Sequence, residues 1–185
     1  MPTEWSIRAI TRAMLPILLA LTLVELGSGL VLKGFEGELL ASPSLLVLVP
    51  VIIGTAGNLG SILAARLSTA FHLGTLGFAP TDDRLLGNAL ATIGLALAMF
   101  PVIGTAAWVL ATITAGARLE LGTVLAVAVA SGASLAVLAV AVTIAVTYAA
   151  YRFELDPDDV AVPVVTNVCD VLGVLVLFGA VHLLV

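Results

Sequence analysis

The sequence has 185 residues, of which 61% are hydrophobic and 10% are charged, and its formal net charge is −5. Soluble domains usually carry about 25% charged residues, so this composition excludes an ordinary water-soluble domain, and no nucleic-acid partner is expected. The single cysteine, Cys169, excludes a disulfide within the chain and a zinc site built from cysteines.

Five long tracts with at most one charged residue each predict five transmembrane helices. A helix needs about 20 apolar residues to cross a hydrocarbon core of roughly 30 Å, and lipid offers no water to the open edge of a sheet. We therefore expect an all-α protein, multi-pass in the cell membrane, with residues 1–185 forming a single transmembrane domain. The expected helices cover residues 10–32, 43–71, 85–115, 121–151 and 157–185.

The basic residues predict the orientation of this bundle, because lysine and arginine favour the cytoplasmic side of a membrane. Five of the seven fall on the side of the N-terminus, and two fall on the other side. The N-terminus is therefore predicted to be cytoplasmic and the C-terminus outside. The first group is Arg8, Arg12, Arg66, Arg84 and Arg152, and the second is Lys33 and Arg118.

The first expected helix contains one acidic residue, Glu25, past its middle. A charge at a helix centre costs roughly 2.5–3.5 kcal/mol on insertion scales, so such a residue suggests a function. Glu25 is a secondary candidate for ion binding, although a bond to a backbone carbonyl explains it equally well. Gly34, Gly37 and Pro43 interrupt the loop that follows, and Glu36 within that loop is another secondary candidate.

The second expected helix is rich in glycine. Pro50 removes a backbone donor and predicts a kink, and Gly54, Gly57 and Gly60 follow at intervals of three residues, with Asn58 among them. Such a segment can unwind and offer its carbonyls to a cation, or it can pack closely against another helix. Gly54, Gly57 and Asn58 are therefore candidates for an ion pathway, and the packing alternative stays open.

The last two connections differ in length and charge. Residues 118–120 form a very short turn, which predicts an antiparallel hairpin of the third and fourth helices. An acidic run precedes the fifth helix, where Asp156 is predicted to cap the helix and Pro157 to begin it. Asp158 and Asp159 could attract divalent ions at an inner mouth, although helix capping and solvation also account for them.

The fifth expected helix holds the strongest candidate, Asp170, which lies about 20 Å along the axis from Pro157. Thr166 and Asn167 lie one turn before it, and Gly173 lies nearly one turn after it. Carboxylate, hydroxyl and amide oxygens are ligands for a hard cation, and glycine allows close approach of a backbone or a hydrated ion. The alternative is a protonated aspartic acid bonded to a neighbouring helix.

Two of these segments resemble one known family. Residues 50–60, PVIIGTAGNLG, resemble the signature on the second membrane helix of the MgtE magnesium channels, and residues 156–163 and 170–173 resemble the start and centre of its fifth helix. Gly34-Phe35-Glu36 is similar to the segment after its first helix. Residues 65–72 are closer to the animal solute-carrier magnesium transporters, which join two such halves in one chain. The resemblance covers residues 10–185 and keeps the order of the elements.

The resemblance implies a function and an assembly. In the MgtE family the counterpart of Asp170 holds a hydrated magnesium ion in a pore on the axis of a homodimer, lined by helices 2 and 5 of both subunits. It therefore implies transport of Mg²⁺ or other divalent cations, with Asp170 as the metal residue and no cofactor. Gly57 and Asn58 would line the pore, and Thr166 and Asn167 would neighbour the site. A two-fold axis would also pair two carboxylates, which a divalent cation neutralises.

The sequence departs from the family in two respects. Bacterial members carry large cytoplasmic regulatory domains that sense magnesium and close the pore, whereas a short segment precedes the first expected helix here. We therefore expect no cytoplasmic regulatory domain. The expected partners are membrane lipid and a separate regulatory protein. Glu25 has no obvious counterpart in the family.

Three other functions compete with a channel. A sodium- or proton-coupled magnesium exchanger is the nearest, and a non-transporting membrane scaffold is another. An intramembrane enzyme is not expected, since the chain contains neither HExxH nor GxSxG, nor a pair of aspartates placed for proteolysis.

Overall fold

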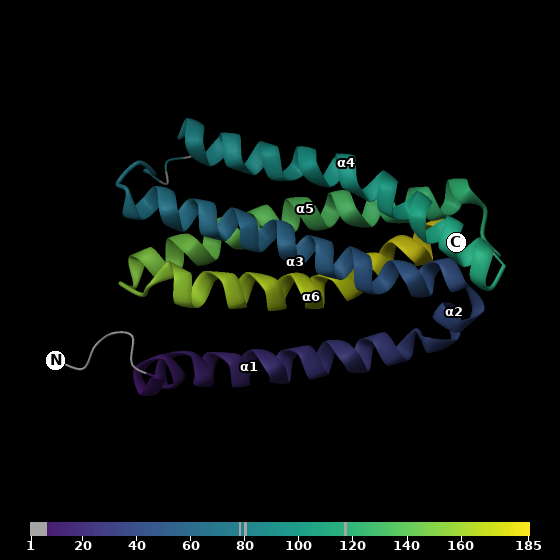
Figure 1. Ribbon diagram of the computed structural model, residues 1–185, viewed down its shortest axis with the longest axis horizontal. Helices are drawn as coiled ribbons and strands as arrows, with labels where there is room; N and C mark the ends of the chain where they lie inside the picture. The colour runs from purple at the N-terminus through teal and green to yellow at the C-terminus, as the bar shows by residue number, and fades with distance from the viewer. Residues whose placement is uncertain (1–6, 78, 80, 117) are drawn as a thin grey trace.

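The structure, a computed structural model, describes residues 7–77, 79, 81–116 and 118–185. Five long helices run back and forth along one direction, with the start of α1 and the end of α6 at opposite ends of the bundle (Figure 1). A short helix, α2, follows the first. The helices are α1 (Ile7–Gly34), α2 (Glu36–Ala41), α3 (Pro43–His72), α4 (Asp83–Thr114), α5 (Leu121–Arg152) and α6 (Pro157–Leu184).

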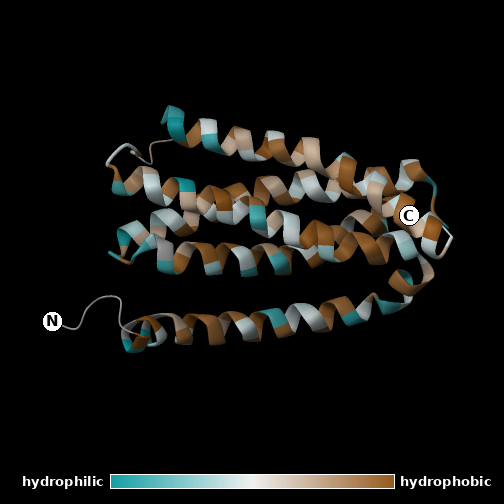
Figure 2. Ribbon diagram, in the orientation of Figure 1, coloured by the Kyte–Doolittle hydropathy of each residue, from teal (hydrophilic) through white to brown (hydrophobic). Residues whose placement is uncertain are grey.

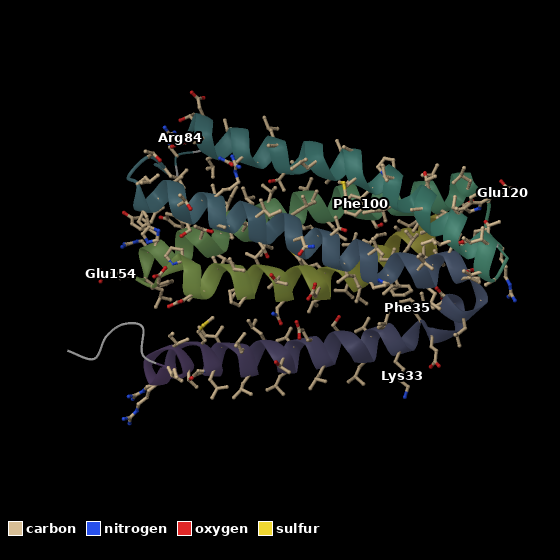
Figure 3. The ribbon with its side chains drawn as sticks, in the orientation of Figure 1. Lys33, Phe35, Arg84, Phe100, Glu120 and Glu154 are labelled. Atoms are coloured by element: carbon tan, nitrogen blue, oxygen red, sulfur yellow. The ribbon has the colours of Figure 1, made fainter. Side chains whose placement is uncertain are left out.

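All five long helices are long and apolar enough to cross a membrane. Hydrophobic residues cover most of their length, as the brown ribbon in Figure 2 shows. The labelled charged residues Lys33, Arg84, Glu120 and Glu154 lie at the two ends of the bundle, where a membrane meets water (Figure 3). The prediction of an all-α, multi-pass membrane protein with five spans is therefore confirmed. Which end faces the cytoplasm stays a prediction.

The contacts between helices place α3, α5 and α6 at the centre of the bundle. α4 packs on α3 and α5 at one edge of the bundle, and among the described helices α1 lies only against α6 and the short α2 (Figure 1). Apolar side chains from four helices meet inside, and one of them, Phe100 of α4, is 1% exposed. Others that are almost fully buried are Leu48 and Ile52 of α3, Leu135 of α5 and Val165 of α6.

Glycine brings α4 and α5 together. A Cβ atom added at Gly132 of α5 would lie 2.1 Å from the ring of Phe100, closer than any side chain can approach. A Cβ at Gly104 of α4 would lie 2.9 Å from Cβ of Ala128. The ring of Phe100 therefore occupies the space that a side chain at position 132 would need. The small residues fix how closely these two helices pack.

The segment after α1 differs from the expected loop, because residues 36–41 form the helix α2. Gly37 lies inside this helix, so it does not interrupt the chain as predicted. Phe35, which Figure 3 labels just before α2, stacks on Phe178 of α6 with the ring centroids 3.9 Å apart. This stacking fastens the C-terminal end of α1 to the core.

The loop between α3 and α4 ends in a capped helix. The Asp82 carboxylate accepts hydrogen bonds from the backbone N–H groups of Arg84 and Leu85 through one oxygen, and from that of Gly77 through the other. The hydrogen bond from Gly77, followed by those from Leu85 and Arg84, lowers the pKa of Asp82 below its usual value. Asp82 thus begins α4 and also closes the preceding loop.

Candidate ion site

Asp170 lies in the middle of a spanning helix, as the fourteenth of the 28 residues of α6. Its side chain is half-buried and faces α3. A Cβ atom added at Gly57 of α3 would lie 3.5 Å from Oδ1 of Asp170. Over the part of the chain that the structure describes, no hydrogen bond or ion pair reaches this carboxylate. Asp170 is thus not bonded to a neighbouring helix among the described residues, which leave its oxygens open to a ligand.

The glycines of α3 provide the close approach between α3 and α6. A Cβ at Gly57 would lie 3.4 Å from Cγ2 of Thr166, and a Cβ at Gly60 would lie 2.5 Å from Cγ1 of Val165. The helix remains continuous from Pro43 to His72, so the segment does not unwind. Gly57 and Gly60 therefore pack closely against α6, and the described backbone of α3 offers no unwound carbonyls as cation ligands. The role of α3 in lining an ion pathway stays a prediction.

Hydroxyl groups link the same two helices one turn from Asp170. Oγ of Ser61 lies 2.8 Å from Oγ1 of Thr166 and 2.8 Å from the carbonyl oxygen of Gly57. Thr166 also donates to the carbonyl oxygen of Val162 on its own helix, at 2.9 Å. These contacts place polar oxygen atoms near Gly57 and Asp170.

Glu25 approaches the same carboxylate from a third helix. α1 packs against α6, and the charges of Glu25 and Asp170 interact across this contact. Glu25 itself is exposed. Two acidic residues that are 145 positions apart in the sequence therefore lie on helices that pack together, and each would strengthen the attraction of the other for a cation.

The other predicted pathway residues take different places. Gly54 and Asn58 are exposed on α3, and nothing lies within 4 Å of a Cβ atom added at Gly54. The side chain of Asn167 donates from Nδ2 to the carbonyl oxygen of Pro163 at 3.1 Å, and its buried Oδ1 has no partner within the described residues. Gly173 packs against α3, where an added Cβ would lie 2.9 Å from Cγ1 of Ile53.

The remaining acidic candidates lie near helix ends. Glu36 is exposed in the first turn of α2, and Asp159 is exposed in the first turn of α6. The side chain of Asp158 lies outside the part of the chain that is described. Glu36 and Asp159 are separated from Asp170 along the bundle, so neither joins the central site.

Sequence reasoning missed several contacts of the site. Ser61 was not singled out, although it follows Gly57 by one helical turn and shares its face. Thr143 of α5 donates to the carbonyl oxygen of Gly60 at 3.4 Å and ties the third central helix to the same segment. The approach of Glu25 to Asp170 was also missed, because the rotation of α1 against α6 has no signal in a uniformly apolar sequence.

Comparisons with known proteins identify the family of this chain. The family model MgtE, a divalent cation transporter, matches residues 49–180. Solute carrier family 41 member 3 of Rattus norvegicus is 32% identical over 146 residues, which cover 72% of this chain and 29% of that protein. The protein of the same name from Mus musculus is 31% identical over 146 residues, with 72% and 28% covered. The chain thus spans less than a third of the length of these curated relatives. Because the family model matches most of the spanning helices, including those that carry Gly57 and Asp170, this chain belongs to the MgtE family of divalent cation transporters.

Proposed function

We propose that this protein carries divalent cations, Mg²⁺ in particular, across the membrane through a pathway on the two-fold axis of a homodimer. α3 and α6 of both subunits line the pathway, and Asp170 is its central carboxylate. The observation that carries this proposal is the mid-helix position of Asp170, whose carboxylate has no partner among the described residues and faces a glycine. A charge in that position is costly unless it serves a ligand.

The chemistry of magnesium fits this site. Mg²⁺ gives up its water reluctantly and is usually bound through one or two carboxylates while it keeps several waters. The described residues of one chain contain no group of three or more His, Cys, Asp or Glu side chains that could enclose a bare ion. A hydrated ion instead needs acceptor oxygens, which the hydroxyl groups of Ser61 and Thr166 add beside Asp170.

Charge balance supports the proposed homodimer. One subunit places one aspartate at the centre of α6, and a two-fold axis beside α6 would bring the two Asp170 residues together. Two like charges repel, and a divalent ion between them cancels that repulsion. Glu25 adds a further negative charge on each side, so the ion would be attracted from the flanking helix as well.

The decisive experiment measures Mg²⁺ uptake into liposomes by Asp170→Asn, which keeps the shape of the side chain and removes its charge. We expect uptake to fall by about tenfold or more, since hydrogen bonds to charged groups contribute about 1.5–3 kcal/mol. Crosslinking should show that the dimer is retained. Glu120→Gln is the matched control, because Glu120 is exposed before α5 and makes no side-chain capping bond. Uptake by Asp170→Asn at the rate of the parent protein would contradict the assignment.

The interaction between Glu25 and Asp170 also favours coupled exchange as a second candidate. Two neighbouring carboxylates can hold a proton or a sodium ion after the divalent cation leaves, which would couple the two movements. Uptake should then depend on an imposed sodium or pH gradient. Uptake that follows the Mg²⁺ gradient alone would favour the channel.

A further inference from the structure

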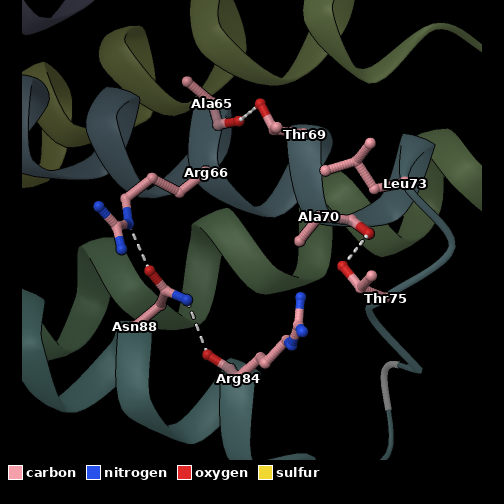
Figure 4. Close-up of a pocket in the computed structure, with 8 residues that line it drawn as sticks. All are labelled: Ala65, Arg66, Thr69, Ala70, Leu73, Thr75, Arg84 and Asn88. Carbon is pink, nitrogen blue, oxygen red and sulfur yellow. Dashed lines mark hydrogen bonds between the residues drawn. The ribbon is translucent and has the colours of Figure 1, made fainter.

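A second polar site lies at the end of the bundle where α3 ends and α4 begins. An open hollow of about 580 Å³ lies between these two helices. Its polar lining consists of Arg66 and Thr69 of α3, Thr75 of the loop, and Arg84 and Asn88 of α4, with Leu73 beside them (Figure 4). No part of the proposed ion pathway uses these residues.

The two arginines carry positive charge that no carboxylate neutralises directly. Within the described ranges, neither Arg66 nor Arg84 forms an ion pair. Asp82 interacts with Arg84 electrostatically, but its oxygens are occupied by the backbone N–H groups of residues 77, 84 and 85. Asp83 is exposed in the first turn of α4. The acidic residues beside the hollow therefore reduce the local positive charge and leave both guanidinium groups free for a ligand.

Asn88 holds one of these arginines in position. Nε of Arg66 donates to Oδ1 of Asn88, and Nδ2 of Asn88 donates at 2.8 Å to the carbonyl oxygen of Arg84 (Figure 4). A guanidinium group has five N–H donors, and only the one at Nε is used in this bond. The terminal nitrogens of Arg66 thus remain available on a side chain whose direction is fixed, unlike an arginine that simply extends towards the headgroups.

The hydroxyl groups add acceptors to the same hollow. Thr69 donates its proton to the carbonyl oxygen of Ala65 at 2.9 Å, and Thr75 donates to that of Ala70 at 2.9 Å. Because each hydroxyl hydrogen is already used, both threonine oxygens present lone pairs. The hollow therefore pairs cationic donors with neutral acceptors, a combination that suits an anion bearing hydroxyl groups.

The position of the hollow identifies the source of that anion. Arg66 is the twenty-fourth residue of the 30-residue α3, so it lies about 9 Å inside the end of a spanning helix. Ala65, Ala70 and Leu73 line the hollow beside the arginines and give it an apolar wall. An apolar wall adds little to the binding of a soluble anion, whereas it can contact the acyl chain of a lipid.

We propose that this hollow binds the phosphate group of an anionic phospholipid with a hydroxyl-bearing headgroup. Arg66 and Arg84 donate to the phosphate oxygens, and Thr69 and Thr75 accept from the headgroup hydroxyls. Arginine suits this role because its planar fork matches the geometry of a phosphate group.

The test uses the full chain purified in detergent, with retention of phosphatidylglycerol measured by native mass spectrometry. Arg66→Gln combined with Arg84→Gln should weaken retention by about a hundredfold, because a charge-assisted bond contributes about 1.5 kcal/mol and each 1.4 kcal/mol is tenfold. Arg152→Gln is the matched control. It removes a positive charge at the same end of the bundle, from the end of α5 and outside the hollow, and should leave retention unchanged.

Further measurements separate the alternatives. Phosphatidylcholine should be retained equally by all variants, and inorganic phosphate should not raise the melting temperature of the protein in phosphatidylcholine. Stabilisation by inorganic phosphate equal to that by phosphatidylglycerol would overturn the lipid as the source. Unchanged retention in the double variant, or an equal loss in Arg152→Gln, would overturn the site itself. If the double variant aggregates, Arg66→Lys serves instead, and it should lose affinity severalfold because it keeps the charge but not the fork.

Discussion

Gly57→Ala isolates the contact between α3 and the carboxylate of Asp170. The added methyl group would lie 3.4 Å from Cγ2 of Thr166 and 3.5 Å from Oδ1 of Asp170, which are ordinary van der Waals distances. The substitution therefore fits without displacing α6. Alanine also favours a helix over glycine by about 1 kcal/mol, so we expect the variant to fold at least as stably as the parent protein.

The same methyl group should impair transport. A water molecule bonded to a carboxylate oxygen lies about 2.7–2.8 Å from it, and a carbon atom at 3.5 Å occupies the side of Oδ1 that faces α3. One bond between a hydrated ion and a charged oxygen is then lost, at a cost of about 1.5 kcal/mol. Uptake of Mg²⁺ into liposomes should fall by roughly tenfold.

Two measurements decide this prediction. Gly94→Ala on α4 is the control, because nothing lies within 4 Å of a Cβ at that position, and it should transport normally. Thermal unfolding in detergent should show that Gly57→Ala is folded. A folded Gly57→Ala that transports like the parent protein would refute the placement of the ion beside Oδ1, and an equal loss in Gly94→Ala would show that glycine content matters in general.

Three further predictions concern packing, pH and charge. Gly132→Ala should lower the free energy of unfolding by about 2 kcal/mol, because its Cβ would lie 2.1 Å from the Phe100 ring. Gly122→Ala is the control, since a Cβ at that position meets nothing within 4 Å. Equal melting temperatures of the two variants would contradict the predicted loss of stability. The lowered pKa of Asp82 means that its stabilisation is complete above the usual carboxyl value of 3.8 and is lost as the pH falls through the lowered value. Asp82→Asn, which keeps a capping oxygen but loses the bond to Gly77, should therefore unfold with a weaker pH dependence below about pH 4, as circular dichroism melts would show. Glu25→Gln should raise the KM for Mg²⁺ uptake severalfold because it removes one attractive charge near Asp170, and an unchanged KM would exclude a role in binding.

Much of the fold could be predicted because lipid imposes simple constraints. Uncharged tracts of spanning length identified the five long helices, and their observed ends lie within a few residues of the expected ones. Pro157 marked the start of α6 correctly, because its ring is compatible with the first turn of a helix and not with its interior. Asp170 could be found because a charge among apolar residues stands out against them.

Contacts between helices could not be predicted in the same way. Glycine at positions 57 and 60 was compatible with unwinding and with close packing, and only the position of Val165 and Thr166 on α6 decides between them. The bond from Arg66 to Asn88 depends on how α4 turns against α3 after the loop. Helix α2 was missed because Gly34 and Gly37 suggested an irregular loop, whereas the local backbone bonds of residues 35–39 favour a helix.

An odd number of crossings has a consequence for how the family can build larger proteins. The start of α1 and the end of α6 lie at opposite ends of the bundle (Figure 1), so they emerge on opposite faces of the bilayer. If two copies were fused directly, the second would enter the membrane upside down relative to the first. A single polypeptide that keeps both halves parallel about one axis therefore needs an additional crossing between them, whereas two separate chains achieve the same symmetry without it.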